Sequence, residues 1–232
     1  MTFSIAGHCP RTGQFGVALA TSSIGAGGRC PHLRPGVGAI LTQARTDPRL
    51  GPLGLDLLAA GRSAQQTIDG IVAATPEASW RQVAAITAAG DVAHWTGSDV
   101  SPPADGMALD GAVVIGNWVK SEAVVAAIAA GFETDPPAEL ADRLIQALEA
   151  GEAEGGELDP LQSAAVMVCA PGWSFPIVDL RVDLSGRPVA DLRTAWERWQ
   201  PIMDGYLQRA VDPASAPSTE ALEGHATDGK KA

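Results

Sequence analysis

Positive charge is scarce in this chain of 232 residues, in which 16 lysines and arginines face 27 aspartates and glutamates for a formal net charge of −11. That balance argues against nucleic acid or an anionic membrane surface as a partner, because both attract basic proteins. An apolar run of the ~20 residues that a membrane span requires is also missing. The amino terminus has no basic stretch ahead of an apolar one, as a secretory signal would, so we expect a cytoplasmic protein.

Residues that bind metals and phosphates are equally sparse. The three cysteines, Cys9, Cys30 and Cys169, form no Cys-x-x-Cys pair, and the four histidines are scattered along the chain. Neither metal-ligand spacing nor the G-x-x-x-x-G-K-[ST] loop that cradles phosphates is present. We therefore expect no metal site and no cofactor. Apolar residues, by contrast, make up 46% of the chain, a share typical of a globular protein.

The hydrophobic pattern predicts an α+β protein. Strands are expected over residues 2–8, 15–21, 37–43, 81–87, 92–96, 112–115, 162–169 and 177–182, and helices over 51–61, 63–74, 121–130 and from Asp135 and Pro188 onward. Because pairs of helices separate blocks of hairpin strands, the order indicates two antiparallel sheets covered by helices rather than a parallel sheet. Ser63 with Gln66 three residues later predicts a capping box at the start of the helix over 63–74. Asp135 is expected to cap the helix that follows it, which carries an apolar stripe of Leu140, Leu144 and Leu148. These elements predict a single domain over residues 1–211.

The carboxy-terminal part differs in composition. Residues 212–232 contain no aromatic and no β-branched apolar side chain, which predicts a disordered tail. Before it, Trp196 and Trp199 lie on the last expected helix. We interpret them as candidate contacts of a homodimer or a larger homo-oligomer, the alternative being that they pack within their own subunit.

Thr2 is the residue whose position carries the most chemistry. Aminopeptidases readily remove a methionine that precedes a small residue, and Thr2 would then bear both a free α-amine and a hydroxyl. A threonine hydroxyl is a weak nucleophile alone, but an adjacent α-amine with a pKa of about 7.7–8 can act as its general base. The first hairpin returns the chain towards Thr2, and a glycine-rich turn with Ser22 and Ser23 follows at that end. The alternative for Thr2 is an ordinary Met-Thr start without a catalytic role. The alternative for the glycine-rich turn is a flexible connection between two elements.

Several segments in order resemble one family. They are TFSI at residues 2–5, FGVALATSS at 15–23, PGVGAILTQA at 35–44, GPLGLDLLAAGRSA at 51–64 and ITAAGDVAHWTG at 86–97. The chain resembles the domain-of-unknown-function family numbered 1028, which belongs with the proteasome β subunits to the N-terminal nucleophile (Ntn) hydrolase superfamily. The resemblance spans roughly residues 2 to 195 and implies a four-layer αββα sandwich.

The same resemblance implies site residues. Thr2 matches the nucleophile, and the backbone N–H groups of Gln43 and Ala44 match the donors to the oxyanion. This implies an amidohydrolase that cleaves a small amide or peptide-like substrate through an acyl-enzyme. Proteasome-like enzymes also place a lysine beside the nucleophile, but no lysine precedes Lys120 here. Arg34, with Arg29, is the nearest candidate cation, although an arginine cannot shuttle protons.

Other positions leave the function open. Asn117 is expected either to bind a substrate carbonyl or to cap the following helix. The chain departs from the family pattern at His8-Cys9, at residues 45–48 and at residues 158–161, which puts substrate and turnover in doubt. The alternative to the hydrolase is therefore a non-catalytic binding or assembly protein with the same fold.

Overall fold

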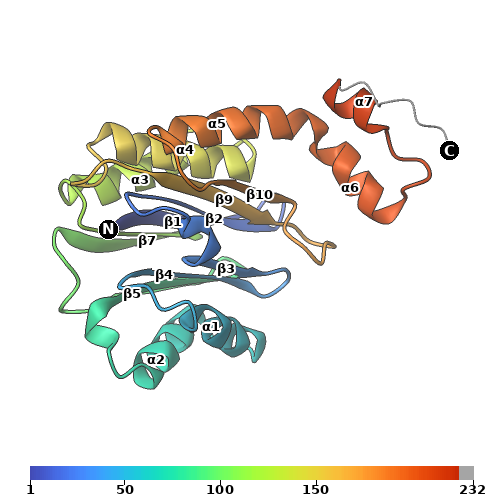
Figure 1. Cartoon of the computed structure of the whole chain (residues 1–232). Helices are drawn as coiled ribbons and strands as arrows, with labels where there is room; N and C mark the ends of the chain where they lie inside the picture. The colour runs from blue at the N-terminus through green and yellow to red at the C-terminus, as the bar shows by residue number, and fades with distance from the viewer. Residues whose placement is uncertain (225–232) are drawn as a thin grey trace. The chain divides into compact units, whose positions relative to one another are not determined.

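The computed structural model of the chain describes residues 1–224 and contains two antiparallel sheets (Figure 1). The larger sheet has six strands in the order β10-β9-β2-β1-β8-β7. Their bounds are β1 Thr2–Cys9, β2 Gln14–Thr21, β7 Ala104–Leu109, β8 Ala112–Asn117, β9 Ser163–Cys169 and β10 Val178–Val182. The predicted hairpin of β1 and β2 is confirmed, and β1 lies in the interior of this sheet, between β2 and β8.

The smaller sheet has four strands in the order β3-β4-β5-β6. Their bounds are β3 Pro31–Arg34, β4 Gly38–Ala44, β5 Arg81–Thr87 and β6 Val92–Thr96. The hairpin of β5 and β6 coincides with the prediction. The sequence did not predict β3 and β7. Half-buried and exposed positions predominate in both strands, so neither shows the apolar run by which buried strands are recognised.

The alternation of side chains in β4 and β5 explains how the layers form. Ala39 and Leu41 of β4 belong to a cluster with residues of β1, β2, β8 and β9, so this face packs on the larger sheet. Ile40, one position along, belongs to a cluster with the helices α1 and α2. Since successive side chains of a strand point to opposite faces, both faces of the smaller sheet are buried.

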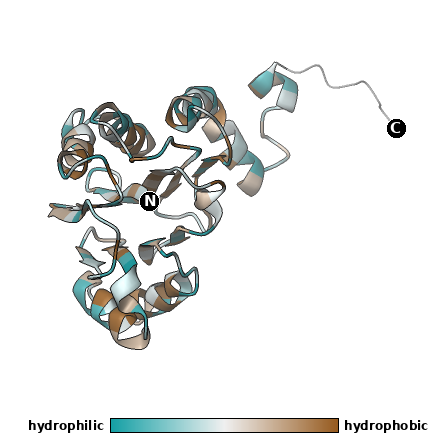
Figure 2. Ribbon diagram, turned by 60° about the vertical axis from the view of Figure 1, so that its left-hand side comes forward, coloured by the Kyte–Doolittle hydropathy of each residue, from teal (hydrophilic) through white to brown (hydrophobic). Residues whose placement is uncertain are grey.

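Helices cover the outer face of each sheet. Helices α1 Leu50–Ala59 and α2 Ala64–Ala74 contact β4, β5 and β6, whereas α3 Ala123–Glu133 and α4 Leu140–Ala153 contact the larger sheet (Figure 1). Brown, hydrophobic positions in Figure 2 concentrate in the strands and in these helices. The layering is compatible with the expected four-layer sandwich.

The helix boundaries follow local signals. Ser63 caps α2 in the predicted capping box: its side chain accepts the Gln66 N–H, and the Gln66 side chain accepts the Ser63 N–H. The predicted stripe of Leu140, Leu144 and Leu148 on α4 is fully buried. The cap of α4 was placed wrongly at Asp135, since the structure has Glu139 there.

Contacts divide the described chain into two compact units, one of Met1–Arg193 and one that begins at Thr194. The predicted domain boundary at residue 211 stays a prediction. Helix α5, Pro188–Trp199, begins at Pro188 as predicted, and α6 Met203–Val211 and α7 Thr219–Glu223 follow it. Helix α7 therefore lies within the tail predicted to be disordered, of which residues 225–232 lie outside the described part.

The tryptophans proposed as oligomer contacts differ in exposure, since Trp196 is only 2% exposed and Trp199 is half-buried. The Trp199 ring lies 5.1 Å from that of Tyr206 in the second unit. Homo-oligomerisation stays a prediction. None of the helices between residues 1 and 224 is long and apolar enough to cross a membrane.

Candidate functional site

Thr2 is the first residue of β1, and the strands on both sides end beside it. Phe3 pairs with Ala20 of β2, and Thr2 pairs with Asn117 of β8. Thr2 is 4% exposed, and its hydroxyl donates to the Met1 carbonyl oxygen and lies 3.4 Å from the Thr21 hydroxyl. The Thr21 hydroxyl donates to the same Met1 carbonyl at 2.7 Å. The peptide bond between Met1 and Thr2 is thus held by two hydroxyl groups.

Two side-chain amides hold the carbonyl oxygen of Thr2. Gln43 Nε2, from β4 of the smaller sheet, donates to it at 3.2 Å, and Asn117 Nδ2 donates at 3.4 Å. Ser4 in turn donates to Gln43 Oε1 at 2.7 Å. The side chain of Asn117 therefore does not cap the next helix, and the capping interpretation was wrong.

Gln82 joins these amides to the rest of the molecule. Its Oε1 accepts from Gln43 Nε2 at 2.7 Å and from Asn117 Nδ2 at 3.0 Å. Its Nε2 donates to the carbonyl oxygens of Gly116 at 2.9 Å and Asp105 at 3.1 Å and to the Thr96 hydroxyl at 3.0 Å. Gln82 lies on β5 of the smaller sheet and is fully buried. Because it bonds to residues of both sheets, it connects them near Thr2.

A pocket of about 290 Å³ opens at this end of the sheets. Its lining residues are Met1, Ala44, Arg45, Trp80, Asp99, Val100, Ser101, Asn117, Trp118 and Asp159. Ala44 has a φ of 70° and Trp118 a φ of 55°, and they are the non-glycine residues with positive φ in the described chain. Such a conformation costs on the order of 1 kcal/mol or more per residue and is found most often at functional sites.

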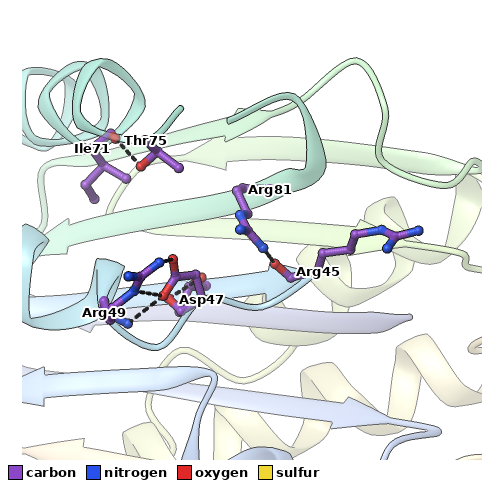
Figure 3. Close-up of polar contacts among 7 residues, drawn as sticks. Arg45, Asp47, Arg49, Ile71, Thr75 and Arg81 are labelled. Carbon is purple, nitrogen blue, oxygen red and sulfur yellow. Dashed lines mark hydrogen bonds and ion pairs between the residues drawn. The ribbon is translucent and has the colours of Figure 1, made fainter. Parts of the chain in front are cut away.

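The segment that follows Ala44 is fixed by polar contacts (Figure 3). The guanidinium of Arg81 donates to the Arg45 carbonyl oxygen, and the Arg45 N–H donates to the Trp80 carbonyl at 3.3 Å. Asp47 accepts two charge-assisted hydrogen bonds from Arg49, at 2.9 and 2.7 Å, and these lower the pKa of its carboxyl to about 2. These contacts support the strained backbone at Ala44 from its carboxy-terminal side.

A buried acid, Glu157, contacts Ser22, the residue that follows β2. It is 6% exposed, and its Oε2 accepts the Ser22 N–H at 2.9 Å. Burial raises the pKa of the Glu157 carboxyl, and burial lowers the pKa of the Met1 amino group. The negative charge of Glu157 is the main influence that opposes the second shift. Ser22 is fixed further by Gln162, whose amide donates to its carbonyl oxygen at 2.6 Å.

The structure brings most of the predicted residues together. Gln43 and Asn117 donate to the Thr2 carbonyl oxygen, and the Ser22 hydroxyl donates to Met1 Sδ at 3.5 Å. Ala44 lines the pocket, and the Ser23 N–H donates to Thr21 Oγ1 at 3.2 Å. No contact described here tests the backbone of Gln43 or Ala44 as an oxyanion donor.

Arg34 is not part of this cluster. It pairs with Gly38, at the opposite end of β4 from Gln43, and its guanidinium forms an exposed ion pair with Asp56 at 2.8 Å. The guanidinium of Arg29 donates to the carbonyl oxygens of Ile24 and Gly25 rather than to a residue of this cluster. These contacts agree with the alternative interpretation of Arg34, a solvated residue at the end of a strand rather than a cation beside Thr2.

Sequence reasoning missed Thr21, Gln82 and Glu157. The sequence did offer a signal for Gln82, because it is an amide next to the apolar run of β5. A buried amide needs hydrogen-bond partners, so this position predicts a polar contact. Glu157 offered no such signal, since it follows a segment rich in glutamate and glycine that is typical of a solvated loop.

Comparisons with known proteins found a family and similar solved structures. A model described as "Family of unknown function (DUF1028)" matches residues 2–192. The chain is similar to the crystal structure of a DUF1028 protein from Silicibacter pomeroyi, with 28% sequence identity over 86% of this chain and 89% of that chain and a TM-score of 0.80. It is also similar to Anbu (ancestral beta-subunit) from Yersinia bercovieri, with 12% identity over 93% of this chain and 98% of that chain and a TM-score of 0.40. No curated protein matches it.

Proposed function

The chain belongs to the DUF1028 family of unknown function, and we propose that it is an Ntn hydrolase whose amino-terminal threonine cleaves the amide bond of a small or peptide-like substrate. One observation carries this proposal. Thr2 begins an interior strand, its carbonyl is held by two buried amides, and Met1 lines the pocket above it. The proposal requires that an aminopeptidase remove Met1, which is 40% exposed. Because Met1 lines the pocket, its removal opens the pocket towards the new amino terminus at Thr2.

The chemistry then follows from Thr2 alone. Its Oγ1 attacks the substrate carbonyl carbon while the α-amine takes the hydroxyl proton. The tetrahedral intermediate collapses, the C–N bond breaks, and the leaving amine takes that proton from the α-ammonium. Water then attacks the resulting ester with the α-amine as base, which releases a carboxylic acid and returns the proton to Oγ1.

The surroundings of Thr2 support this role. The oxygen that becomes negative needs fixed N–H donors, and one such donor typically lowers the barrier by ~2.7–4 kcal/mol. We propose the backbone N–H groups of Gln43 and Ala44, because Ala44 lines the pocket in a strained conformation that the contacts of Arg81 and Arg45 support. Fixed positions of this kind cost no rearrangement during the reaction.

The experiment compares four proteins on a panel of small amides and short peptides. They are the chain beginning at Thr2, released from a cleavable fusion, its Thr2→Ala and Thr2→Ser variants, and the chain that keeps Met1. We expect hydrolysis by the first and by Thr2→Ser, and a loss on the order of 10³-fold or more in Thr2→Ala and with Met1 retained. Thr134→Ala, at the end of α3, is the matched control.

A mass increase on the Thr2 peptide during turnover would identify the acyl-enzyme. Hydrolysis that Thr2→Ala leaves unchanged would refute the proposal. If no panel member is cleaved and the protein from its native host keeps Met1, the alternative of a binding or assembly protein takes its place. The hydroxyls of Thr2 and Thr21 would then serve to hold the Met1 carbonyl.

A further inference from the structure

Glu157 crosses the end of β1 at Thr2. Its backbone forms a bridge with Val119, which follows β8 on one side of β1. Its carboxylate accepts the N–H of Ser22, which follows β2 on the other side. Because β1 lies between β8 and β2, the side chain of Glu157 spans the position from which the chain of β1 starts.

The carboxylate is buried, and the nearby hydroxyls of Ser22 and Thr21 oppose the rise of its pKa without a hydrogen bond to Oε1. Oε2 accepts the Ser22 N–H at 2.9 Å, but Oε1 is inaccessible to solvent and has no hydrogen-bond partner among residues 1–224. No lysine, arginine or histidine of that range forms an ion pair with Glu157. A buried carboxylate with an unpaired oxygen destabilises a fold unless a cation or donor reaches it.

The positive group close to Glu157 is the amino terminus. In the chain that keeps Met1, this charge belongs to the Met1 ammonium and attracts Glu157 without forming an ion pair within 4 Å in the described residues. Removal of Met1 moves the ammonium one residue inward, onto the end of the strand that Glu157 crosses. It also leaves the new amine without the Met1 carbonyl beside it.

We propose that Glu157 is a positioning residue, the counter-ion that receives the α-ammonium of Thr2 on Oε1 once Met1 has been removed. The inference rests on the proposed function only in requiring a chain that begins at Thr2. No lysine precedes Lys120 in the chain, so the ionisable side chain beside the amine is then a carboxylate. A carboxylate stabilises the protonated amine, so this site would need a higher pH than one with a lysine before its base is free.

Other charged groups near the amino terminus are few. The Cys30 thiol and the Asp159 carboxyl act on it in the same direction as Glu157 but more weakly. Burial raises the pKa of Cys30, which therefore stays a neutral thiol near pH 7. Arg45 and Asp99 line the pocket beyond them. Glu157 is thus the side chain whose removal changes the charge at Thr2 most.

The test measures the pKa of the Thr2 α-amine in chains that begin at Thr2, from the pH dependence of its acetylation rate in N-terminal peptides. We expect Glu157→Gln to lower this pKa by about 1–3 units, the shift that a nearby opposite charge produces. Glutamine still accepts the Ser22 N–H, so folding should persist and is checked by circular dichroism. Glu154→Gln, an exposed neighbour, should leave the pKa unchanged.

This readout needs no substrate, so it separates the two proposals. An α-amine pKa that is the same in Glu157→Gln, in Glu154→Gln and in the unsubstituted chain would overturn the counter-ion, whatever the protein hydrolyses. A lowered pKa in a protein that cleaves no amide would support the counter-ion and leave the hydrolase refuted. If Glu157→Gln does not fold, Glu157→Asp, which withdraws the charge by one methylene, replaces it with the same expected direction.

Discussion

Replacing Gln82 with methionine tests whether the buried amides beneath Thr2 hold the two sheets together. The side chain of Gln82 makes five hydrogen bonds, to Gln43, Asn117, Thr96 and the carbonyl oxygens of Asp105 and Gly116. Methionine has a similar length and fills the space, so the substitution removes the polar contacts without opening a large cavity.

The expected loss follows from the partners that remain. Gln43 and Asn117 keep their bonds to the Thr2 carbonyl, so each loses only part of its pairing. The Gly116 and Asp105 carbonyl oxygens lose a side-chain donor. A stranded buried group costs about 1–3 kcal/mol, and the gain in apolar surface offsets part of this. We therefore expect the free energy of unfolding to fall by about 3–5 kcal/mol.

Urea unfolding of Gln82→Met and of the unsubstituted chain measures this difference, provided that the slopes of the two transitions agree. Gln65→Met is the matched control, because Gln65 is exposed on α2 and its side chain donates to Asp69 of the same helix. It should change the free energy by less than about 0.5 kcal/mol. A loss below about 1 kcal/mol for Gln82→Met would refute the reasoning, since the amides would then be replaceable by packing alone.

Three further outcomes are expected. Gly16→Ala should lower the melting temperature in a thermal scan, at a cost of about 1–3 kcal/mol, because its Cβ would lie 2.5 Å from the Met167 carbonyl oxygen; unchanged melting would contradict this packing. Ser63→Ala should cost ~1 kcal/mol in urea unfolding by removing the capping box with Gln66, and Ser63→Gly should cost less. In the chain that keeps Met1, burial raises the pKa of Glu157, so stability should fall as pH rises above about 4.3 through the folded-state pKa. Glu157→Gln should flatten that fall in melting temperatures measured from about pH 4 to pH 8, and equal slopes would count against it.

Local signals were sufficient for much of the fold. Gln66 three residues after Ser63 predicted the start of α2, and the spacing of Leu140, Leu144 and Leu148 predicted the buried face of α4. Strands β3 and β7 were not predicted, because half-buried and exposed side chains predominate in them and they show no apolar run. Pairing of their backbones with β4 and β8 stabilises them. The family resemblance was confirmed over residues 2–192.

The sequence by itself determined the antiparallel α+β organisation and the family, because these depend on periodicity and on segments whose residues are close together in the chain. The role of Thr2 stays a prediction. The surroundings of Thr2 were decided by the tertiary structure. Gln82 and Glu157 lie 80 and 155 positions from Thr2 in the printed numbering, and no local pattern joins them. They lie near the start of β1 because β1 lies between β2 and β8 and packs on the smaller sheet. Gln82 there bonds to Gln43 and Asn117, and Glu157 accepts the Ser22 N–H.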